Sequence, residues 1–172
     1  VAYRLGMRYC AFNFSDGFRE QVMLPFCEAY RRARTPNPCI ECNRRMKFDA
    51  LFRRAEELGC TGTHFANTHG LPDENHYTTA HDIALIYREA ISHDLFAEIS
   101  GTVSYSVAPT NVSDVRELSN TNSLINQNAT FYPGYYYEYA KDGKTGHTSA
   151  AGYCLVSSAE QNGVHVIAAV LG

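Results

Sequence analysis

The sequence predicts an α+β fold, because helix-like patterns come before strand-like patterns along the chain. Two amphipathic helices are expected over residues 48–59 and 79–91, and three strands between residue 135 and the end of the chain. A hydrophobic content of 45% over 172 residues is enough for a packed core, in one ordinary domain or two very small ones. Wholesale disorder is therefore not expected.

The two helical patterns carry their own start and stop signals. In residues 48–59, apolar side chains recur on one face, and Gly59 can end the helix. Thr79 and Asp82 form a Thr-x-x-Asp capping pattern at the start of the second helix. The buried stripe of that helix is expected to consist of Ile83, Ile86, Tyr87, Ala90 and Ile91.

The C-terminal part of the sequence is typical of antiparallel strands. Residues 110–130 are rich in Asn, Ser and Thr and predict a loop with short elements. Strands are expected at Tyr135–Ala140, Gly152–Ala159 and Val164–Leu171. The Asn-Gly pair between the last two favours a tight hairpin.

The charge balance changes sign near residue 60, and the use of cysteine and histidine changes at the same point. Residues 1–60 hold eleven of the fifteen Lys and Arg and have a balance of +4, whereas residues 61–172 have a balance of −7. Five of the six cysteines lie in the first segment and all seven histidines in the second. No Pro/Gly/Ser linker separates the segments, so the change indicates two pieces with different histories. We expect no signal peptide in the first residues and no transmembrane segment, and a chain that starts inside a domain.

Residues 34–48 form a basic string around a C-x-x-C pair, reading Arg-Thr-Pro-Asn-Pro-Cys-Ile-Glu-Cys-Asn-Arg-Arg-Met-Lys-Phe. Two prolines hold an extended turn that presents Cys39 and Cys42. Nearby cationic side chains favour the reactive thiolate of a cysteine and attract a phosphate backbone. Candidate nucleic-acid contacts are Arg34, Arg44, Arg45 and Lys47, with Arg31 and Arg32 nearby.

This string resembles tRNA-specific 2-thiouridylases, ATP-dependent enzymes that place sulfur on the wobble uridine of tRNA. The resemblance covers residues 1–59 and implies a mainly helical fragment of an α/β PP-loop ATPase-like domain. It implies a role in sulfur chemistry for Cys42, with Cys39 at a position that varies in the family, and tRNA as a partner. The family's ATP-binding Ser-Gly-Gly-x-Asp-Ser loop is not in the sequence, so no adenylation is expected.

Two groups of possible metal ligands are not interpreted as metal sites. Cys39, Cys42, Cys60 and His64 have a spacing close to that of a zinc ribbon, but the last two lie beyond the apparent junction. The histidines at positions 64, 69, 76 and 81 form the second group, and histidines with a structural role are commoner than metal ligands. No metal and no cofactor are therefore predicted.

From residue 59 onward, a series of motifs resembles the C-terminal half of the transpeptidase domain of D-alanyl-D-alanine carboxypeptidases. These are the low-molecular-weight penicillin-binding serine peptidases. The motifs include Thr63-His64-Phe65, His69-Gly70-Leu71-Pro72, His76-Tyr77-Thr78-Thr79-Ala80, Asn120-Thr121-Asn122 and Lys144-Thr145-Gly146-His147-Thr148. The resemblance implies a partial β-lactamase/transpeptidase-like fold, with antiparallel C-terminal strands and helices. It also implies a peptidoglycan peptide or a β-lactam as partner.

The Lys-Thr-Gly motif has a chemistry that suits such a substrate. A cationic Lys144 and the hydroxyl of Thr145 can hold the terminal carboxylate of a peptide that lies along a sheet edge. Gly146 leaves room for the substrate backbone to approach the strand closely. The resemblance thus assigns carboxylate binding to Lys144, Thr145 and Gly146.

The family's nucleophile motif does not occur in this sequence. No serine is followed by lysine three positions later, and no Ser-x-Asn motif is found upstream of Lys144. We therefore expect a chimera of a thiouridylase-like fragment, residues 1–58, and a carboxypeptidase-like fragment, residues 59–172, without peptidase activity of its own. The two resemblances imply different locations, cytoplasmic for the first and extracytoplasmic for the second, and the sequence does not decide between them. A third alternative is a non-catalytic module that binds peptide carboxylates.

Overall fold

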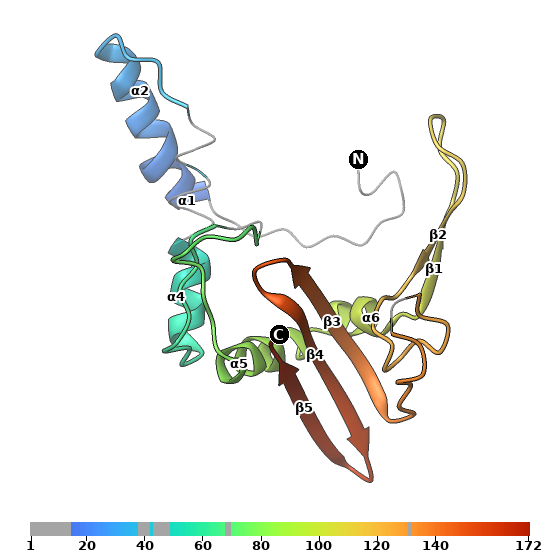
Figure 1. The fold of residues 1–172 in the computed structure, drawn as a ribbon. Helices are drawn as coiled ribbons and strands as arrows, with labels where there is room; N and C mark the ends of the chain where they lie inside the picture. Colours follow the sequence, from blue (N-terminus) through green and yellow to red (C-terminus); the bar gives the residue numbers. More distant parts are fainter. Residues whose placement is uncertain (1–14, 38–41, 43–48, 68–69, 131) are drawn as a thin grey trace. The chain divides into compact units, whose positions relative to one another are not determined.

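The computed structural model describes residues 15–37, 42, 49–67, 70–130 and 132–172 (Figure 1). The chain divides into two compact units, Val1–Arg54 and Ala55–Gly172. The predicted boundary between residues 58 and 59 concerns the ancestry of two segments rather than their packing, and it stays a prediction. No helix in the described part of the chain is both long and apolar enough to cross a bilayer.

The described part of the first unit begins with a continuous helical stretch. Helix α1 (Ser15–Phe18), the π-helical segment η2 (Arg19–Met23) and helix α2 (Leu24–Arg31) follow one another without a break. Pro25 lies in the first turn of α2, where it cannot donate a backbone hydrogen bond to the preceding turn. The π-helical segment η2 lies directly before this turn. Glu28 pairs with Arg32 at 3.0 Å and with Arg31 at 3.7 Å on the exposed surface of α2.

Both predicted helices are confirmed. Helix α4 (Asp49–Glu57) is followed by Gly59 at a φ of 85°, a left-handed conformation that glycine adopts without strain. Helix α5 (Ala80–Ile91) begins after Thr79, whose side chain accepts a hydrogen bond from the Asp82 backbone N–H at 3.1 Å. Tyr87 is the buried residue of the expected stripe, and its other members are half-buried. Helix α6 (Asp94–Gly101) was not predicted.

Asp82 is buried although it belongs to the first turn of α5. Only 2% of its surface is exposed. Its Oδ2 atom accepts hydrogen bonds from the Thr63 hydroxyl at 2.7 Å and from the Gly62 N–H at 2.8 Å. Asp82 therefore supplies the backbone N–H that the Thr79 cap accepts, and its side chain ties the preceding loop to the start of the helix. The Thr63 hydrogen bond, followed by that from Gly62, lowers the pKa of Asp82 against the opposing effect of burial.

The lowered pKa of Asp82 predicts that this loop loosens in acid. A carboxyl whose pKa is lower in the folded state stabilises that state above its unfolded pKa, about 3.9 for Asp. The contribution is lost as the pH falls through the folded pKa, below that value. We expect the difference in free energy of unfolding between the wild type and Asp82→Asn to shrink as the pH falls below about 4. Urea unfolding at a series of pH values measures it, and a difference that stays constant across that range contradicts this role of Asp82.

The described part of the second unit contains two antiparallel sheets. Strands β1 (Ser104–Val107) and β2 (Arg116–Ser119) form a hairpin. Strands β3 (Ala140–Thr148), β4 (Gly152–Gln161) and β5 (Val164–Val170) form a sheet in the order β3-β4-β5, which places β3 at one edge (Figure 1). The predicted β4–β5 hairpin is confirmed, with Asn162 and Gly163 at φ values of 52° and 78°.

The predicted strand Tyr135–Ala140 is wrong. This segment makes a turn, in which the Ala140 N–H donates to the Tyr137 carbonyl at 3.0 Å. The Tyr137 N–H in turn donates to the carbonyl of Leu124 in the preceding loop at 2.9 Å. The run of tyrosines has a high strand propensity, but these turn and loop contacts override it. Strand β3 starts at Ala140, where the prediction ended.

The helices pack on the three-stranded sheet around a polar centre. Helix α5 contacts β4 and β5, and α6 contacts β3. Tyr87 of α5 donates a hydrogen bond to Oδ1 of Asp142 on β3, and Ser158 of β4 donates to the same atom at 2.5 Å. Burial, together with this hydrogen bond to Asp142, raises the pKa of Tyr87. Asp142 therefore joins a helix and two strands at the point where β3 begins.

Candidate carboxylate-binding site

The Lys-Thr-Gly motif lies in the middle of the edge strand β3. Lys144, Thr145 and Gly146 are paired with Val156, Leu155 and Cys154 of β4, respectively. Four residues of β3 precede Lys144, and the motif lies between two of the strands that were expected from the sequence. Its position on an edge strand fits the expectation of a ligand that lies along a sheet edge.

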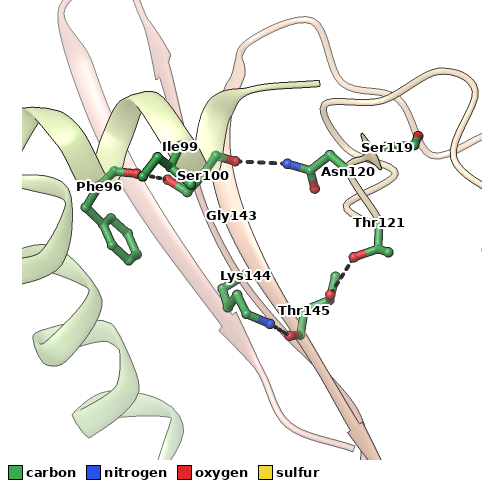
Figure 2. Close-up of a pocket in the computed structure, with 9 residues that line it drawn as sticks. All are labelled: Phe96, Ile99, Ser100, Ser119, Asn120, Thr121, Gly143, Lys144 and Thr145. Atoms are coloured by element: carbon green, nitrogen blue, oxygen red, sulfur yellow. Dashed lines mark hydrogen bonds between the residues drawn. The ribbon is translucent and has the colours of Figure 1, made fainter. Parts of the chain in front are cut away.

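A pocket of about 320 Å³ lies beside the motif, within the range of small-ligand sites. Its wall is made by α6, by the last residue of β2 with the two residues after it, and by the middle of β3 (Figure 2). Lys144 is the charged residue among those that line the pocket. The lining residues are Phe96, Ile99, Ser100, Ser119, Asn120, Thr121, Gly143, Lys144 and Thr145.

The polar groups of the pocket are arranged to receive an anion. Lys144 is exposed, and its ammonium group donates a hydrogen bond to the carbonyl oxygen of Thr145 (Figure 2). Within the described parts of the chain, Lys144 forms no ion pair with a carboxylate. The hydroxyl groups of Thr145 and Thr121 are 2.8 Å apart. One cation and two hydroxyl groups without a neighbouring acid favour a carboxylate as the ligand.

The segment after β2 is held in place by its own asparagines. The Asn120 side chain donates to the carbonyls of Ser100 at 3.2 Å and Thr102 at 3.0 Å, which fixes the segment to the end of α6. Asn122 is only 1% exposed, and its amide lies 3.4 Å from the Ser157 hydroxyl and 3.5 Å from the Asp142 carbonyl. Asparagine side chains thus replace regular secondary structure in this loop, which the sequence composition alone predicted to be irregular.

Two glycines of β3 have different surroundings. A Cβ atom on Gly143 would lie 2.2 Å from the Asn122 amide nitrogen, so the buried asparagine needs a glycine opposite it. A Cβ atom on Gly146 would have its nearest neighbour, the Cys154 Cβ, at 4.0 Å. Packing within the protein therefore requires Gly143 but not Gly146. The space beside Gly146 is open to a ligand. Such space is needed if a substrate backbone is to approach the strand at Gly146.

The predicted site residues of the first segment are only partly described. Arg34 is exposed, and Cys42 is a half-buried free thiol. Cys39, Arg44, Arg45 and Lys47 lie outside the described residues. Their assigned roles in sulfur chemistry and tRNA contact stay predictions.

Several residues of the metal-like patterns have structural contacts. Cys60 is buried and donates a hydrogen bond through Sγ to the Asp82 carbonyl at 3.6 Å. His64 pairs with Tyr77 in an isolated β-bridge, and Nδ1 of His76 accepts from the Ala66 N–H at 3.0 Å. His81 is exposed beside Asp82, and His69 lies outside the described residues. Over the described ranges, no three His, Cys, Asp or Glu side chains gather as a metal site would require.

A residue that lines the pocket, Thr121, and the buried residue after it, Asn122, are functional candidates that the sequence did not indicate. The Asn-Thr-Asn string was recognised as part of the carboxypeptidase resemblance, but it was given no role. Thr121 contacts Thr145 across 24 residues of sequence, and Asn122 lies beneath Gly143. Nothing in the local pattern indicates these contacts, because they depend on how the loop returns to β3.

Solved structures of a DD-transpeptidase and of a D-alanyl-D-alanine carboxypeptidase have a fold similar to that of this chain. A DD-transpeptidase from Streptomyces K15 superposes with a TM-score of 0.64 and 26% identity, over 80% of this chain and 50% of that one. A D-alanyl-D-alanine carboxypeptidase from Mycobacterium tuberculosis gives a TM-score of 0.60 and 28% identity, over 73% of this chain and 44% of that one. Fold and site together thus define a transpeptidase-type α+β unit with a Lys-Thr-Gly edge strand.

The sequence comparisons specify the family more closely. The family model for D-alanyl-D-alanine carboxypeptidases matches residues 46–172, and the chain belongs to this family. The D-alanyl-D-alanine carboxypeptidase DacF of Bacillus subtilis is 37% identical over 121 residues, which are 70% of this chain and 28% of that protein. The chain therefore spans half or less of the relatives that it matches.

The N-terminal segment matches a second family. The model for the tRNA methyl transferase HUP domain matches residues 1–85, so the two family models overlap over residues 46–85. The tRNA-specific 2-thiouridylase MnmA of Clostridium acetobutylicum is 52% identical over 59 residues, which are 34% of this chain and 17% of that protein. Both resemblances expected from the sequence are thereby confirmed.

Proposed function

We propose that the second unit is the carboxylate-binding half of a D-Ala-D-Ala carboxypeptidase site and binds the C-terminal carboxylate of a peptidoglycan stem peptide or of a β-lactam. The observation that carries this proposal is the placement of Lys144 and Thr145 in one pocket on an edge strand, with no acidic residue among those that line it. A charge-assisted hydrogen bond from the ammonium group and one from the hydroxyl would hold the two carboxylate oxygens. The strand edge supports the peptide backbone beside them.

The same 172 residues are proposed to bind without hydrolysing. Acyl transfer needs an activated nucleophile, and no serine in the sequence has a lysine three positions later. The roles of Lys144, Thr145 and Gly146 are thus confined to binding and electrostatic stabilisation. A fluorescent penicillin tests this point, since covalent labelling of the purified chain requires a nucleophile. Labelling that survives denaturation would refute the proposed inactivity.

Peptide binding tests the carboxylate site itself. We expect N-acetyl-D-alanyl-D-alanine to bind the chain, and Lys144→Ala to weaken this binding at least about tenfold, because hydrogen bonds to a charged group contribute about 1.5–3 kcal/mol. Calorimetric titration gives the affinity. Lys141→Ala is the matched control, because Lys141 is an exposed lysine of the same strand that pairs with Glu160 at 3.9 Å and does not line the pocket. Equal affinities of wild type and Lys144→Ala would contradict the proposal.

A second function is proposed for residues 1–58, namely weak tRNA binding by a fragment of a 2-thiouridylase. The 52% identity to MnmA over 59 residues supports it. Arg31 and Arg32 pair with Glu28, whereas Arg34 makes no ion pair within the described part of the unit. Retention of tRNA that falls steeply with added salt supports this function, and retention that does not depend on salt speaks against it.

We also propose that the chain joins two ancestral segments near residue 58. The overlap of the two family models over residues 46–85 supports a junction inside sequence that suits both families. Sequencing the coding DNA across positions 50–70 tests this origin. Two separate loci for the two halves would make the join an artefact, and one continuous reading frame would make the fusion real.

A further inference from the structure

Thr121 reaches the Lys-Thr-Gly motif from a segment that sequence reasoning did not connect with it. Its hydroxyl lies 2.8 Å from the Thr145 hydroxyl, and both residues line the pocket (Figure 2). Each hydroxyl carries one proton and can accept further hydrogen bonds. If the Thr121 proton points to the Thr145 oxygen, the Thr145 proton is free to point into the pocket.

The residues on both sides of Thr121 hold it in this position. Asn120 is fixed to the carbonyls at the end of α6, and the Asn122 N–H donates to the Asn120 side chain at 2.9 Å. The Asn122 side chain is enclosed beneath Gly143. Since both neighbours are anchored, the Thr121 backbone cannot move away from β3 without breaking these contacts. The side chain itself is exposed, so it has no part in the buried core.

We propose that Thr121 is a positioning residue of the carboxylate site, whose hydroxyl directs the proton of Thr145 toward the ligand. This inference rests on the proposed carboxylate-binding function. Thr121 acts through Thr145, so its effect on binding must depend on the presence of the Thr145 hydroxyl. A role in packing alone would not show this dependence.

The test compares threonine variants of the full 172-residue chain with N-acetyl-D-alanyl-D-alanine as the probe. Thr121→Val is expected to weaken binding by about three- to tenfold, the range of one neutral hydrogen bond. Thr121→Ser keeps the hydroxyl and is expected to bind within about twofold of the wild type. Thr110→Val, which removes a hydroxyl outside the pocket, is expected to bind like the wild type. In a Thr145→Val background, Thr121→Val is expected to cause no further loss.

The possible outcomes separate this inference from the function on which it rests. If the wild type binds and Thr121→Val binds equally well, the positioning role is overturned and the carboxylate site stands. Equal losses in Thr121→Ser and Thr121→Val, or an undiminished loss in the Thr145→Val background, also overturn it. If the folded wild type does not bind the peptide, the proposed function fails, and the inference about Thr121 fails with it.

Discussion

Replacing Asp142 by alanine is expected to lower the free energy of unfolding of the second unit by about 3–4 kcal/mol. Asp142 is only 6% exposed, and its Oδ1 atom accepts hydrogen bonds from Tyr87 and Ser158. Alanine would leave both hydroxyl groups buried without their acceptor, and each such group costs about 1–3 kcal/mol. Urea unfolding followed by far-UV circular dichroism measures the change.

Two further variants separate the lost hydrogen bonds from other effects of the Asp142 substitution. Asp142→Asn keeps a carbonyl oxygen for the two donors, so a smaller loss of about 1–2 kcal/mol is expected. In a Tyr87→Phe background, Asp142→Ala should cost less than in the wild type, because one of the stranded donors is already gone. If Asp142→Ala does not change the urea midpoint of unfolding, the Tyr87–Asp142–Ser158 contacts do not hold β3 against α5.

The sequence predicted the elements whose signals are local. In α5, the Thr79 cap and the apolar spacing depend on neighbours a few positions apart. The same is true of the Asn162-Gly163 turn between β4 and β5. The turn at Tyr135–Ala140 escaped prediction because it depends on Tyr137 donating to Leu124, outside the segment. The resemblance to the carboxypeptidases, rather than periodicity, located Lys144 and Thr145.

The buried polar residues could not be predicted by the same reasoning. Asp82 and Asp142 would be read as solvent-exposed from sequence, since carboxylates are rarely buried without partners. Their hydrogen-bond donors come from distant positions in the sequence. Thr63, which donates to Asp82, is 19 residues away from it, and Tyr87, which donates to Asp142, is 55 residues away. Only the folded topology brings these donors to the carboxylates. The buried contacts that hold the carboxylate site in place can therefore be seen only in the tertiary structure. Its charged residue, Lys144, can be found from the sequence motif.

Gly143→Ala is expected to destabilise the second unit by about 2–3 kcal/mol and to disturb the carboxylate site at the same time. The new methyl group would lie 2.2 Å from the Asn122 amide nitrogen and 3.0 Å from the Val156 carbonyl. Asn122 is 1% exposed and cannot swing aside, so relief of the clash must displace the loop that carries Thr121. Urea unfolding and titration with N-acetyl-D-alanyl-D-alanine should both change. A second substitution, Asn122→Ala, should make room for the methyl group, so that Gly143→Ala costs less in that background.

Gly146→Ala is the matched control for Gly143→Ala, because it adds the same methyl group three residues further along the same strand. Its new Cβ atom would meet nothing in the protein closer than 4.0 Å, so the free energy of unfolding is expected to change by less than about 0.5 kcal/mol. If the peptide backbone lies against β3 at this point, the methyl group occupies its place, and affinity should fall about tenfold. We expect Gly146→Ala to lose affinity but not stability, and Gly143→Ala to lose both. That result would assign Gly146 to contact with the ligand and Gly143 to contact with Asn122. Unchanged affinity in Gly146→Ala would mean that the peptide does not approach β3 at Gly146.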